Sequence, residues 1–583
     1  MSTVEFRACH GSAIGRSHGR QEEKRTIMSQ TEPPASPRLP ALDRRSLLRG
    51  GLLGGGLFAA PLAAQFDTAA AGFTHGVASG EPGHDRLLLW TRYSAAQDVT
   101  LTWQVLSADA NRRMIAEGQV IASPDNDFCC KAWADELEPG RWYYYRFIAP
   151  DGTTSDLGRT RTLPQGPTPR WRMAVFSCSN IGFGWFNAYA HAASTNEFDC
   201  TLHLGDYLYE YPQGTYPGER ETLPGRARLD PQDEIVSLAQ YRARYATYRA
   251  DRDLQRLHQL YPMIAGWDDH ESTNDSWAGG AQNHQPETEG EWSVRKSVAM
   301  KAYREWMPVS DDPWAAYEVG DLATLFRLET RLSARSQQFD YATILRGTAS
   351  PEEALARLAA FRDGAYADPA REVLGADQQG WLAQGMARSR RGGTTWQVLV
   401  QQVLMGRVAS ATSLTDSLPE GLPDYILERV RSGALASRSE LPLNMDAWDG
   451  YPAARARLLE AALASDANLI SLAGDTHNAW AFDLAQAGQA AGIEFAVQSV
   501  TSPGFESYLP QIGPRDFARA MIARNSQLKW MDSSRRGYMA VELTPERATS
   551  EYRFLAGIRE KAAGIAATTR MTALAGANKL AMG

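Results

Sequence analysis

Short apolar runs that end abruptly in polar residues are the feature that most constrains how this chain can fold. Six of them begin at or after Arg172, namely RMAVFSCS, CTLHLGD, MIAGWDDH, LATLFRLE, WQVLVQQV and LISLAGDTH. Helical stretches such as 293–307 and 351–364 lie between them. Strands that alternate with helices form α/β domains, in which ligands gather at the carboxyl ends of the strands. We therefore predict an α/β domain over residues 171–556.

The segments on either side of this alternating region have patterns of their own. Residues 73–164 contain VTLTWQVLSAD and the aromatic run from Trp142 to Phe147, separated by the turn signals SPDN, EPG and PDGT. This pattern predicts a small all-β sandwich of the fibronectin type III kind, with the Pro-rich segment LPQGPTPR as its boundary. Later, IEFAVQSV, GYMAVELT and TSEYRFLA predict closing strands, and we expect residues 557–583 to form a helical tail.

Length and charge narrow the class of protein. A chain of 583 residues is too long for one ordinary core, and 43% hydrophobic with 22% charged residues is typical of a folded soluble protein. The chain carries 60 Lys and Arg against 68 Asp and Glu, a net charge of −8. Because nucleic-acid-binding proteins use positive charge to neutralise phosphates, we expect no stable nucleic-acid partner.

Residues 1–71 have the features of an export signal. Arg44 and Arg45 precede an apolar run from Gly51 to Ala64, which is shorter than the roughly 20 residues that span a bilayer. Small residues at 62–64 and at 69–71 offer cleavage sites, and Met28 is an alternative start. The pattern predicts a twin-arginine signal, and its alternative is a buried apolar helix after a basic loop. We expect the twin-arginine export machinery as a partner, no transmembrane anchor, and a periplasmic or extracellular location.

Four of the apolar runs are followed by side chains that commonly bind metals. These are Cys178; Asp206 and Tyr209; Asp268, Asp269 and His270 with Asn274 nearby; and Asp475 and His477. They lie far apart in the sequence and could meet only if their strands lie side by side in one sheet. Carboxylates packed together repel and raise one another's pKa unless cations lie between them. The pattern therefore predicts a metal cluster.

Each of these positions also has a purely structural interpretation. Cys178 could be an inert buried thiol, Asp206 a helix N-cap, and Tyr209 a core residue whose hydroxyl bonds to the backbone. The run 268–270 could be a solvated turn, and residues 475–477 could cap a helix. Ligand-type side chains recur after four separate strands, and this recurrence favours the metal cluster.

These motifs resemble those of the alkaline phosphatase D (PhoD-like) family of exported metallophosphatases. FTHGVASGEP, LLLWTR, LEPGRWYYYRF and GRTRTLP resemble its N-terminal domain. FSCSN, HLGDYLYEY, WDDHE and GDTHN resemble its metal-site motifs, and LGADQQGWL and RGYMAVELT resemble later segments. The resemblance covers about residues 73–555. It implies a metallophosphatase-type α/β sandwich as the catalytic domain.

The family is similar to the calcineurin-like and purple acid phosphatases, whose pattern is GDxxY, GNH[DE] and GHxH. The resemblance implies a role for each matching residue: Asp206 bridges two metals, Tyr209 binds the first metal, Asp269 replaces the Asn, His270 is the catalytic histidine, Asp475 replaces the first His, His477 is the second, and Cys178 replaces the first Asp. It also implies Fe³⁺ together with Ca²⁺, and anionic thiolate, phenolate and carboxylate ligands agree with these cations. With only ten histidines in the chain, a His-dominated zinc site is not expected.

Three positions depart from these patterns. Glu329 in LETR stands where the family often has Asp, and Ser272 follows His270-Glu271 where the family has Val. Superfamily members also have a further His in the region of VLVQQVLMG, where this chain has Gln401 and Gln402. Gln402 is therefore a weak candidate ligand.

The implied reaction is hydrolysis of phosphate mono- and diesters by a metal-activated water. His270 would stabilise the phosphoryl group or protonate the leaving oxygen. Arg331 and Arg335 are candidate phosphate clamps, because arginine binds phosphate bidentately, or else ordinary surface arginines. The alternatives are a strict phosphodiesterase of phospholipase D-like activity and a non-catalytic surface binding protein. An oxygen-activating iron enzyme is disfavoured because the chain lacks a two-His-one-carboxylate spacing.

Overall fold

The structure is a computed structural model that describes residues 72–226, 228–417, 424–561 and 564–581. The twin-arginine pair and both cleavage sites of the predicted export signal lie outside these residues, so that signal stays a prediction. Within the described part of the chain, we find no helix that is both long and apolar enough to cross a membrane.

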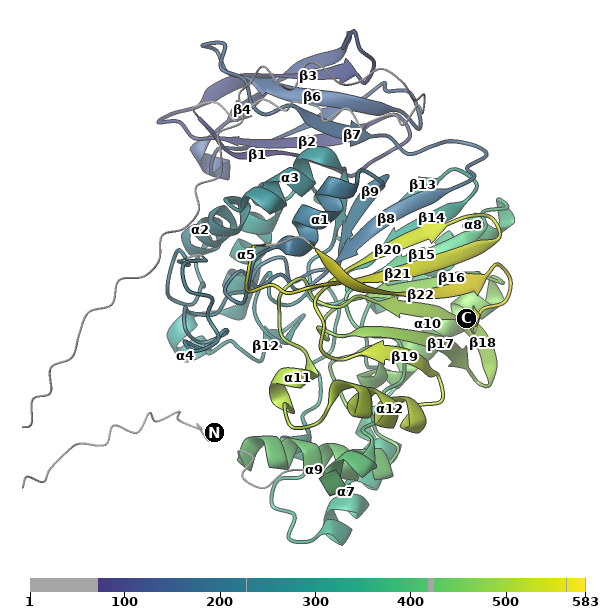
Figure 1. Cartoon of the computed structure of the whole chain (residues 1–583). Coiled ribbons are helices and arrows are strands. Elements are labelled where there is room, and N and C mark those ends of the chain that lie inside the picture. The colour runs from purple at the N-terminus through teal and green to yellow at the C-terminus, as the bar shows by residue number, and fades with distance from the viewer. Residues whose placement is uncertain (1–71, 227, 418–423, 562–563, 582–583) are drawn as a thin grey trace, which may run out of the picture. The chain divides into compact units, whose positions relative to one another are not determined.

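Two large sheets form the α/β part of the protein (Figure 1). The first sheet contains, in spatial order, β23 (Leu580–Ala581), β22 (Ile565–Leu574), β21 (Arg547–Leu555), β20 (Gly537–Leu543), β8 (Trp171–Phe176), β9 (Cys200–His203), β10 (Met263–Ala265), β1 (Phe73–Gly80), β2 (Leu87–Tyr93) and β5 (Cys129–Ala134). The second contains β13 (Ala315–Val319), β14 (Ala323–Arg327), β15 (Trp396–Val400), β16 (Leu469–Ala473), β18 (Gln489–Ala496), β17 (Ala479–Gln486) and β19 (Leu528–Asp532). All six predicted apolar runs are parallel strands: β8, β9 and β10 in the first sheet, and β14, β15 and β16 in the second.

The two sheets pack face to face, and helices cover their outer faces. Largely apolar strands such as β16 are buried along their whole length, as expected for strands covered on both faces. One core lies between the sheets, where Met173 and Ile264 of the first meet Val398 and Ile470 of the second. The helices over the first sheet are α1 (Asn187–Thr195), α2 (Leu238–Arg249), α3 (Arg252–Leu260) and α5 (Trp292–Trp306); those over the second are α8 (Gly375–Arg391), α10 (Pro452–Ala464) and α12 (Pro514–Arg524). The predicted α/β sandwich is thus confirmed.

Shorter elements complete the α/β part. They are α4 (Pro286–Glu289), α6 (Tyr341–Ile344), α7 (Pro351–Asp363), α9 (Asp424–Arg438), α11 (Phe505–Tyr508), β11 (Ser276–Trp277) and β12 (Gly280–Ala281). The helices predicted at 293–307 and 351–364 are confirmed as α5 and α7. Ser350 caps α7, since its side chain accepts a hydrogen bond from the Glu353 backbone N–H, and Pro351 begins the helix.

The all-β N-terminal region is confirmed, but its second sheet is shared with the α/β part. An antiparallel sheet contains β4 (Met114–Ala122), β3 (Val99–Ser107), β6 (Trp142–Ile148) and β7 (Gly158–Arg161). It packs through a core of its own against β1, β2 and β5. Strand β1 also pairs in parallel with β10, with Gly80 beside Met263. A Cβ atom at Gly80 would lie 2.0 Å from the Pro308 carbonyl oxygen, so this junction requires glycine.

The predicted helical tail at 557–583 is wrong. Residues Ile565–Leu574 form β22, which pairs antiparallel with β21 along its whole length, and β23 pairs with β22. The burial of β22 alternates from residue to residue, as in a strand with one covered face. The many alanines suggested a helix, but pairing with an existing sheet edge decides the conformation, because strand preference depends on the neighbouring strand.

Candidate metal centre

The four predicted strand ends meet, but their strands belong to two sheets. Cys178, Asp206 and Asp269 follow β8, β9 and β10 of the first sheet, whereas Asp475 follows β16 of the second. The expectation that all four strands lie in one sheet is therefore wrong. Glycine lets the two sheets approach here: a Cβ atom at Gly474 would lie 2.3 Å from Ser177 Oγ across the sandwich.

The backbone turns sharply at most of these ligand positions. Four candidate ligands have left-handed conformations: Cys178 (φ 59°), Asp206 (φ 54°), Asp475 (φ 63°) and His477 (φ 64°). This conformation costs a non-glycine residue about 1 kcal/mol, and such residues cluster at functional sites. Gly205, with φ 107°, lets two loops come together, because a Cβ atom there would lie 2.4 Å from the Cβ of Asp268.

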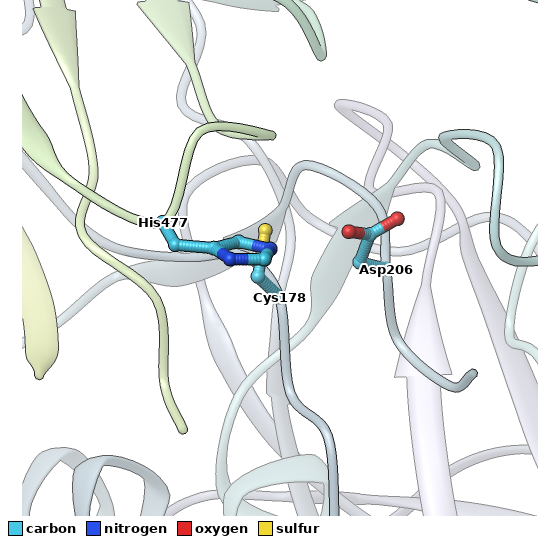
Figure 2. A group of neighbouring side chains, drawn as sticks. All are labelled: Cys178, Asp206 and His477. Atoms are coloured by element: carbon cyan, nitrogen blue, oxygen red, sulfur yellow. The ribbon is translucent and has the colours of Figure 1, made fainter. Parts of the chain in front are cut away.

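The candidate ligand atoms fall into three overlapping groups, and within each group they lie within 4.8 Å of one another. The groups are Cys178, Asp206 and His477; Asp206, Asp269 and His270; and Asp268, Asp269 and Asp475. Figure 2 shows the members of the first group reaching together from three separate segments of the chain. Because Asp206 and Asp269 each belong to two groups, the three form one connected cluster.

Tyr209 lies within the first group. Its hydroxyl donates to Asp206 Oδ2 at 3.0 Å, accepts from Ser502 Oγ at 2.8 Å and lies 3.3 Å from His477 Nε2. His477 Nδ1 donates to the Pro503 carbonyl at 2.7 Å. Burial lowers the pKa of His477 to about 3, so the ring is neutral and Nε2 presents a lone pair to the cluster.

The chemistry of the cluster fits cations. Three carboxylate oxygens, Asp206 Oδ1, Asp268 Oδ2 and Asp269 Oδ1, are buried and accept no hydrogen bond, whereas nearly all buried acceptors in proteins are satisfied. Burial raises the pKa of Asp206 and of Asp475 well above the ordinary value. Burial and the charge of Asp206 likewise raise the pKa of the Cys178 thiol. A cation among these groups would stabilise their anionic forms.

His270 is held by a carboxylate that sequence analysis did not single out. Glu210 is fully buried and accepts from His270 Nδ1 at 2.6 Å. It also accepts from Thr273 Oγ1 at 2.9 Å and from Asn283 Nδ2 at 3.0 Å, which fixes its own position. Burial lowers the pKa of His270, but the charges of Glu210, Asp269 and Asp206 outweigh burial and raise it well above the ordinary value.

Arg331 and Arg335, the candidate phosphate clamps, are both buried and both paired with carboxylates. Arg331 donates from Nε to Asp268 Oδ1 at 2.5 Å and from Nη1 to Asp446 Oδ2 at 2.6 Å, and its Nη2 lies 3.3 Å from Asp475 Oδ1. Arg335 pairs with Asp446 Oδ1 at 2.6 Å. Their charges compensate buried carboxylates. The surface-arginine alternative is wrong, because Arg331 is 0% and Arg335 1% exposed.

Glu329, the departure from the family pattern, shapes the loop that carries Arg331. Its carboxylate accepts from Trp267 Nε1 at 3.0 Å and from three successive backbone N–H groups, those of Arg331, Leu332 and Ser333, each at 2.7 Å. A longer acidic side chain is thus accommodated by a folded loop. Glu271 joins two ligand loops in a similar way, accepting from the backbone N–H groups of Asp206, Tyr207 and Asp268.

Three weaker candidates bind neighbouring protein groups. Gln402 accepts from Thr330 Oγ1 at 2.6 Å and donates to the Leu328 carbonyl at 3.2 Å. Gln401 donates to the Val403 carbonyl and accepts from Trp448 Nε1. Asn274 Nδ2 donates to Gln282 Oε1, and its backbone N–H donates to Glu210.

Sequence analysis missed other acidic residues of the cluster. Asp446 binds both buried arginines, and the Asp275 backbone N–H donates to Asp269 Oδ2 at 2.6 Å. Burial and the charges of Asp446 and Asp269 raise the pKa of Asp275 to about 7. Asp446 lies in a loop with no preceding strand, so no local pattern marked it. Glu210 stands inside the GDYLYEY motif, where its position next to Tyr209 was an available signal.

Comparison with known proteins defines the class of this site. The sequence model of the PhoD-like phosphatases matches residues 173–552, and that of the PhoD-like phosphatase N-terminal domain matches residues 59–164. The fold and these matches define a hydrolase of phosphoric esters. More particularly, the chain belongs to the PhoD-like phosphatase family.

Two relatives show the extent of the likeness. Alkaline phosphatase D of Bacillus subtilis (strain 168) is 30% identical over 559 residues, which cover 90% of this chain and 86% of the relative. A solved structure of PhoD superposes with a TM-score of 0.70 at 27% identity, covering 88% of this chain and 92% of the other. The likeness thus extends over both the N-terminal domain and the α/β domain.

Proposed function

We propose that the protein is an exported, metal-dependent phosphatase that hydrolyses both phosphate monoesters and phosphodiesters. The observation that carries the proposal is the set of three buried carboxylate oxygens without donors, at the edge where the two sheets meet. When bound, the cations would supply an activated water and neutralise charge on the phosphoryl group.

The donor set supports Fe³⁺ and Ca²⁺ as the cations. Cys178, Tyr209, Asp206 and His477 would hold the iron, since thiolate, phenolate and carboxylate are anionic ligands suited to a trivalent ion. Asp206 would also bind the second cation, together with Asp269. The group of Asp268, Asp269 and Asp475 offers only carboxylate oxygens, the ligands that calcium takes.

His270 would act as the general acid. Its Nδ1 is bonded to Glu210, so Nε2–H is the group that can give a proton to the leaving oxygen. Such proton transfer is worth ~10²–10⁴-fold in rate. The buried Glu210 carboxylate supports this role, because its hydrogen bond to Nδ1 fixes the orientation of the ring.

The test is a parallel assay of a monoester and a diester after chelation and separate addition of iron and calcium. We expect hydrolysis of both esters only when both metals are restored. A preparation that hydrolyses them undiminished without metal would contradict the proposal. Hydrolysis of the diester alone would favour the alternative of a strict phosphodiesterase or phospholipase D-like enzyme; family membership sets the non-catalytic binding protein aside.

The export part of the proposal depends on Arg44 and Arg45. Changing both to lysine in the full chain should keep the protein in the cytoplasm, as seen by cell fractionation, whereas the wild-type chain should leave it. Equal distribution of the two proteins would contradict twin-arginine export.

A further inference from the structure

A phosphate ester brings acceptor oxygens, so its site needs N–H or O–H donors that the protein's own acceptors leave free. Arg331 does not meet this need, because all three of its side-chain nitrogens already face carboxylates. Arg536 does meet it. Its side chain is 9% exposed, and its buried Nη1 has no hydrogen-bond partner, while Nη2 is paired with Glu506.

The position of Arg536 follows from the first sheet. Arg536 directly precedes β20, which runs antiparallel to β8 with Met539 opposite Val175. The beginning of β20 therefore lies beside the end of β8, where Cys178 begins the metal cluster. Two backbone hydrogen bonds link the start of β20 to the segment after β8. The Gly537 N–H donates to the Ser499 carbonyl at 3.0 Å, and the Val500 N–H donates to the Ser177 carbonyl at 2.9 Å.

A further contact places the guanidinium near the cluster. Its partner Glu506 belongs to α11, which begins two residues after Pro503, the residue whose carbonyl binds His477 Nδ1. Arg536 thus carries a buried positive charge with an unused donor at the edge of the candidate metal centre.

The neighbouring Arg535 provides a contrast within the same loop. Its Nε donates to Asp532 Oδ2 at 2.8 Å, and its guanidinium lies over the Phe554 ring, 3.8 Å from the centroid. The Arg535 side chain is 38% exposed against 9% for Arg536. The Arg535 side chain is therefore engaged by neighbouring protein groups, whereas Arg536 keeps one N–H donor without a partner.

We propose that Arg536 binds a non-bridging oxygen of the substrate's phosphoryl group through Nη1, with Glu506 holding the guanidinium in place. The inference rests on the proposed function. A single fixed cation attracts a doubly charged monoester phosphate more strongly than a singly charged diester, so Arg536 also favours monoesters. Arg536 takes the clamping role for which Arg331 and Arg335 were candidates in the sequence.

The experiment compares Arg536→Ala and Arg536→Lys with Arg535→Ala in the metal-loaded protein. Binding of inorganic phosphate is measured by calorimetry, and kcat and KM are measured for a monoester and a diester. A charge-assisted hydrogen bond is worth about 10- to 100-fold in binding. We expect Arg536→Ala to lose that much phosphate affinity and monoester kcat/KM, with a smaller loss on the diester, while Arg535→Ala stays within about twofold of wild type.

A second variant separates substrate binding from a purely structural role. Glu506→Gln removes the negative charge of the partner but keeps a side-chain oxygen that can accept from Arg536 Nη2, so the guanidinium stays in place and the variant should retain most phosphate affinity. The inference is overturned if Arg536→Ala binds phosphate as tightly as wild type, if it loses bound metal, or if Glu506→Gln reproduces its defect. A wild-type protein that hydrolyses neither ester would instead contradict the proposed function, and phosphate binding would still decide the role of Arg536.

Discussion

At the scale of single residues, Asp206 and His270 are neighbours with different roles. Asp206 belongs to two ligand groups, whereas His270 belongs to one and its Nδ1 is bonded to Glu210. We predict that Asp206→Asn abolishes both metal retention and turnover. His270→Ala should keep the metal but lower turnover by ~10²–10⁴-fold. Elemental analysis of the purified variants beside steady-state kinetics measures both quantities, and loss of metal from His270→Ala would contradict this division of roles.

Glu210 gives a second prediction at this scale, as a positioning residue for His270. Glu210→Gln removes the negative charge that favours the protonated ring while preserving the shape of the side chain. A general acid matters most when the leaving oxygen is basic. Turnover of an alkyl phosphate should therefore fall about 10-fold or more, while a 4-nitrophenyl ester should be nearly unaffected. Equal losses on the two substrates, or loss of metal, would contradict the role.

The residues that could be predicted at the centre are those that follow strands. Cys178, Asp206 and Asp475 stand directly after apolar runs, so their convergence could be expected from the sequence. Asp446 could not be found, because it lies in a loop and meets Arg331 only through tertiary packing. For the same reason, the burial of Arg331 among carboxylates had no local signal.

At the scale of elements, Glu494 of β18 holds the segment after β15 in place by accepting hydrogen bonds from its backbone. Its carboxylate accepts from the Met405 and Gly406 N–H groups, both at 2.8 Å, and from Ser471 Oγ at 2.9 Å. Burial outweighs these bonds and raises the pKa of Glu494 from 4.5 to about 7. Because the folded pKa is raised, the protonated side chain contributes stability below about pH 4.5 that is lost as the pH rises through 7.

Glu494→Gln should remove this dependence on pH. The wild-type protein should lose up to about 3 kcal/mol at this position between pH 4.5 and pH 8, whereas the variant should lose none of it there. Thermal unfolding of both proteins across that pH range measures the difference. Parallel curves for the two proteins would show that Glu494 does not titrate in this range.

The elements themselves were predictable where one face or both faces of a strand carry a clear apolar signal. Helices α5 and α7 and the six parallel strands predicted as apolar runs belong to this class. Strand β22 does not, since its alanine and threonine residues are compatible with a helix or a strand, and pairing with β21 decides between them. The division of the strands between two sheets could not be predicted either, because a fully buried strand has the same apolar sequence pattern in either sheet.

At the scale of the whole molecule, the N-terminal domain is built into the α/β domain. Glu81, at the end of β1, lies 3.3 Å from Arg327 Nη1 of β14 and accepts from the Tyr317 hydroxyl at 2.7 Å. Arg327 in turn donates to the Ala265 carbonyl at 3.1 Å, just before the loop that carries Asp268. The N-terminal domain thus supports the loop of the candidate metal centre.

We predict that Glu81→Ala destabilises the protein by about 3 kcal/mol, because it leaves the buried charge of Arg327 without its partner. Glu81→Gln keeps an acceptor for Tyr317 and should cost less. Glu318→Ala removes a carboxylate that is 72% exposed and should have little effect. Denaturant unfolding of the three variants gives the comparison, and equal stability of Glu81→Ala and Glu318→Ala would contradict it.

The origin of the candidate ligands in both sheets has a mechanical consequence. A cation held by Asp206 and His477, or by Asp269 and Asp475, would connect a loop of the first sheet to a loop of the second and so cross-link the two halves of the sandwich. Ligands that bind only the folded state stabilise it by mass action. Stripping the ions should therefore lower the melting temperature and first loosen the sheet edge where they were bound, which hydrogen exchange at the residues around Gly474 would reveal.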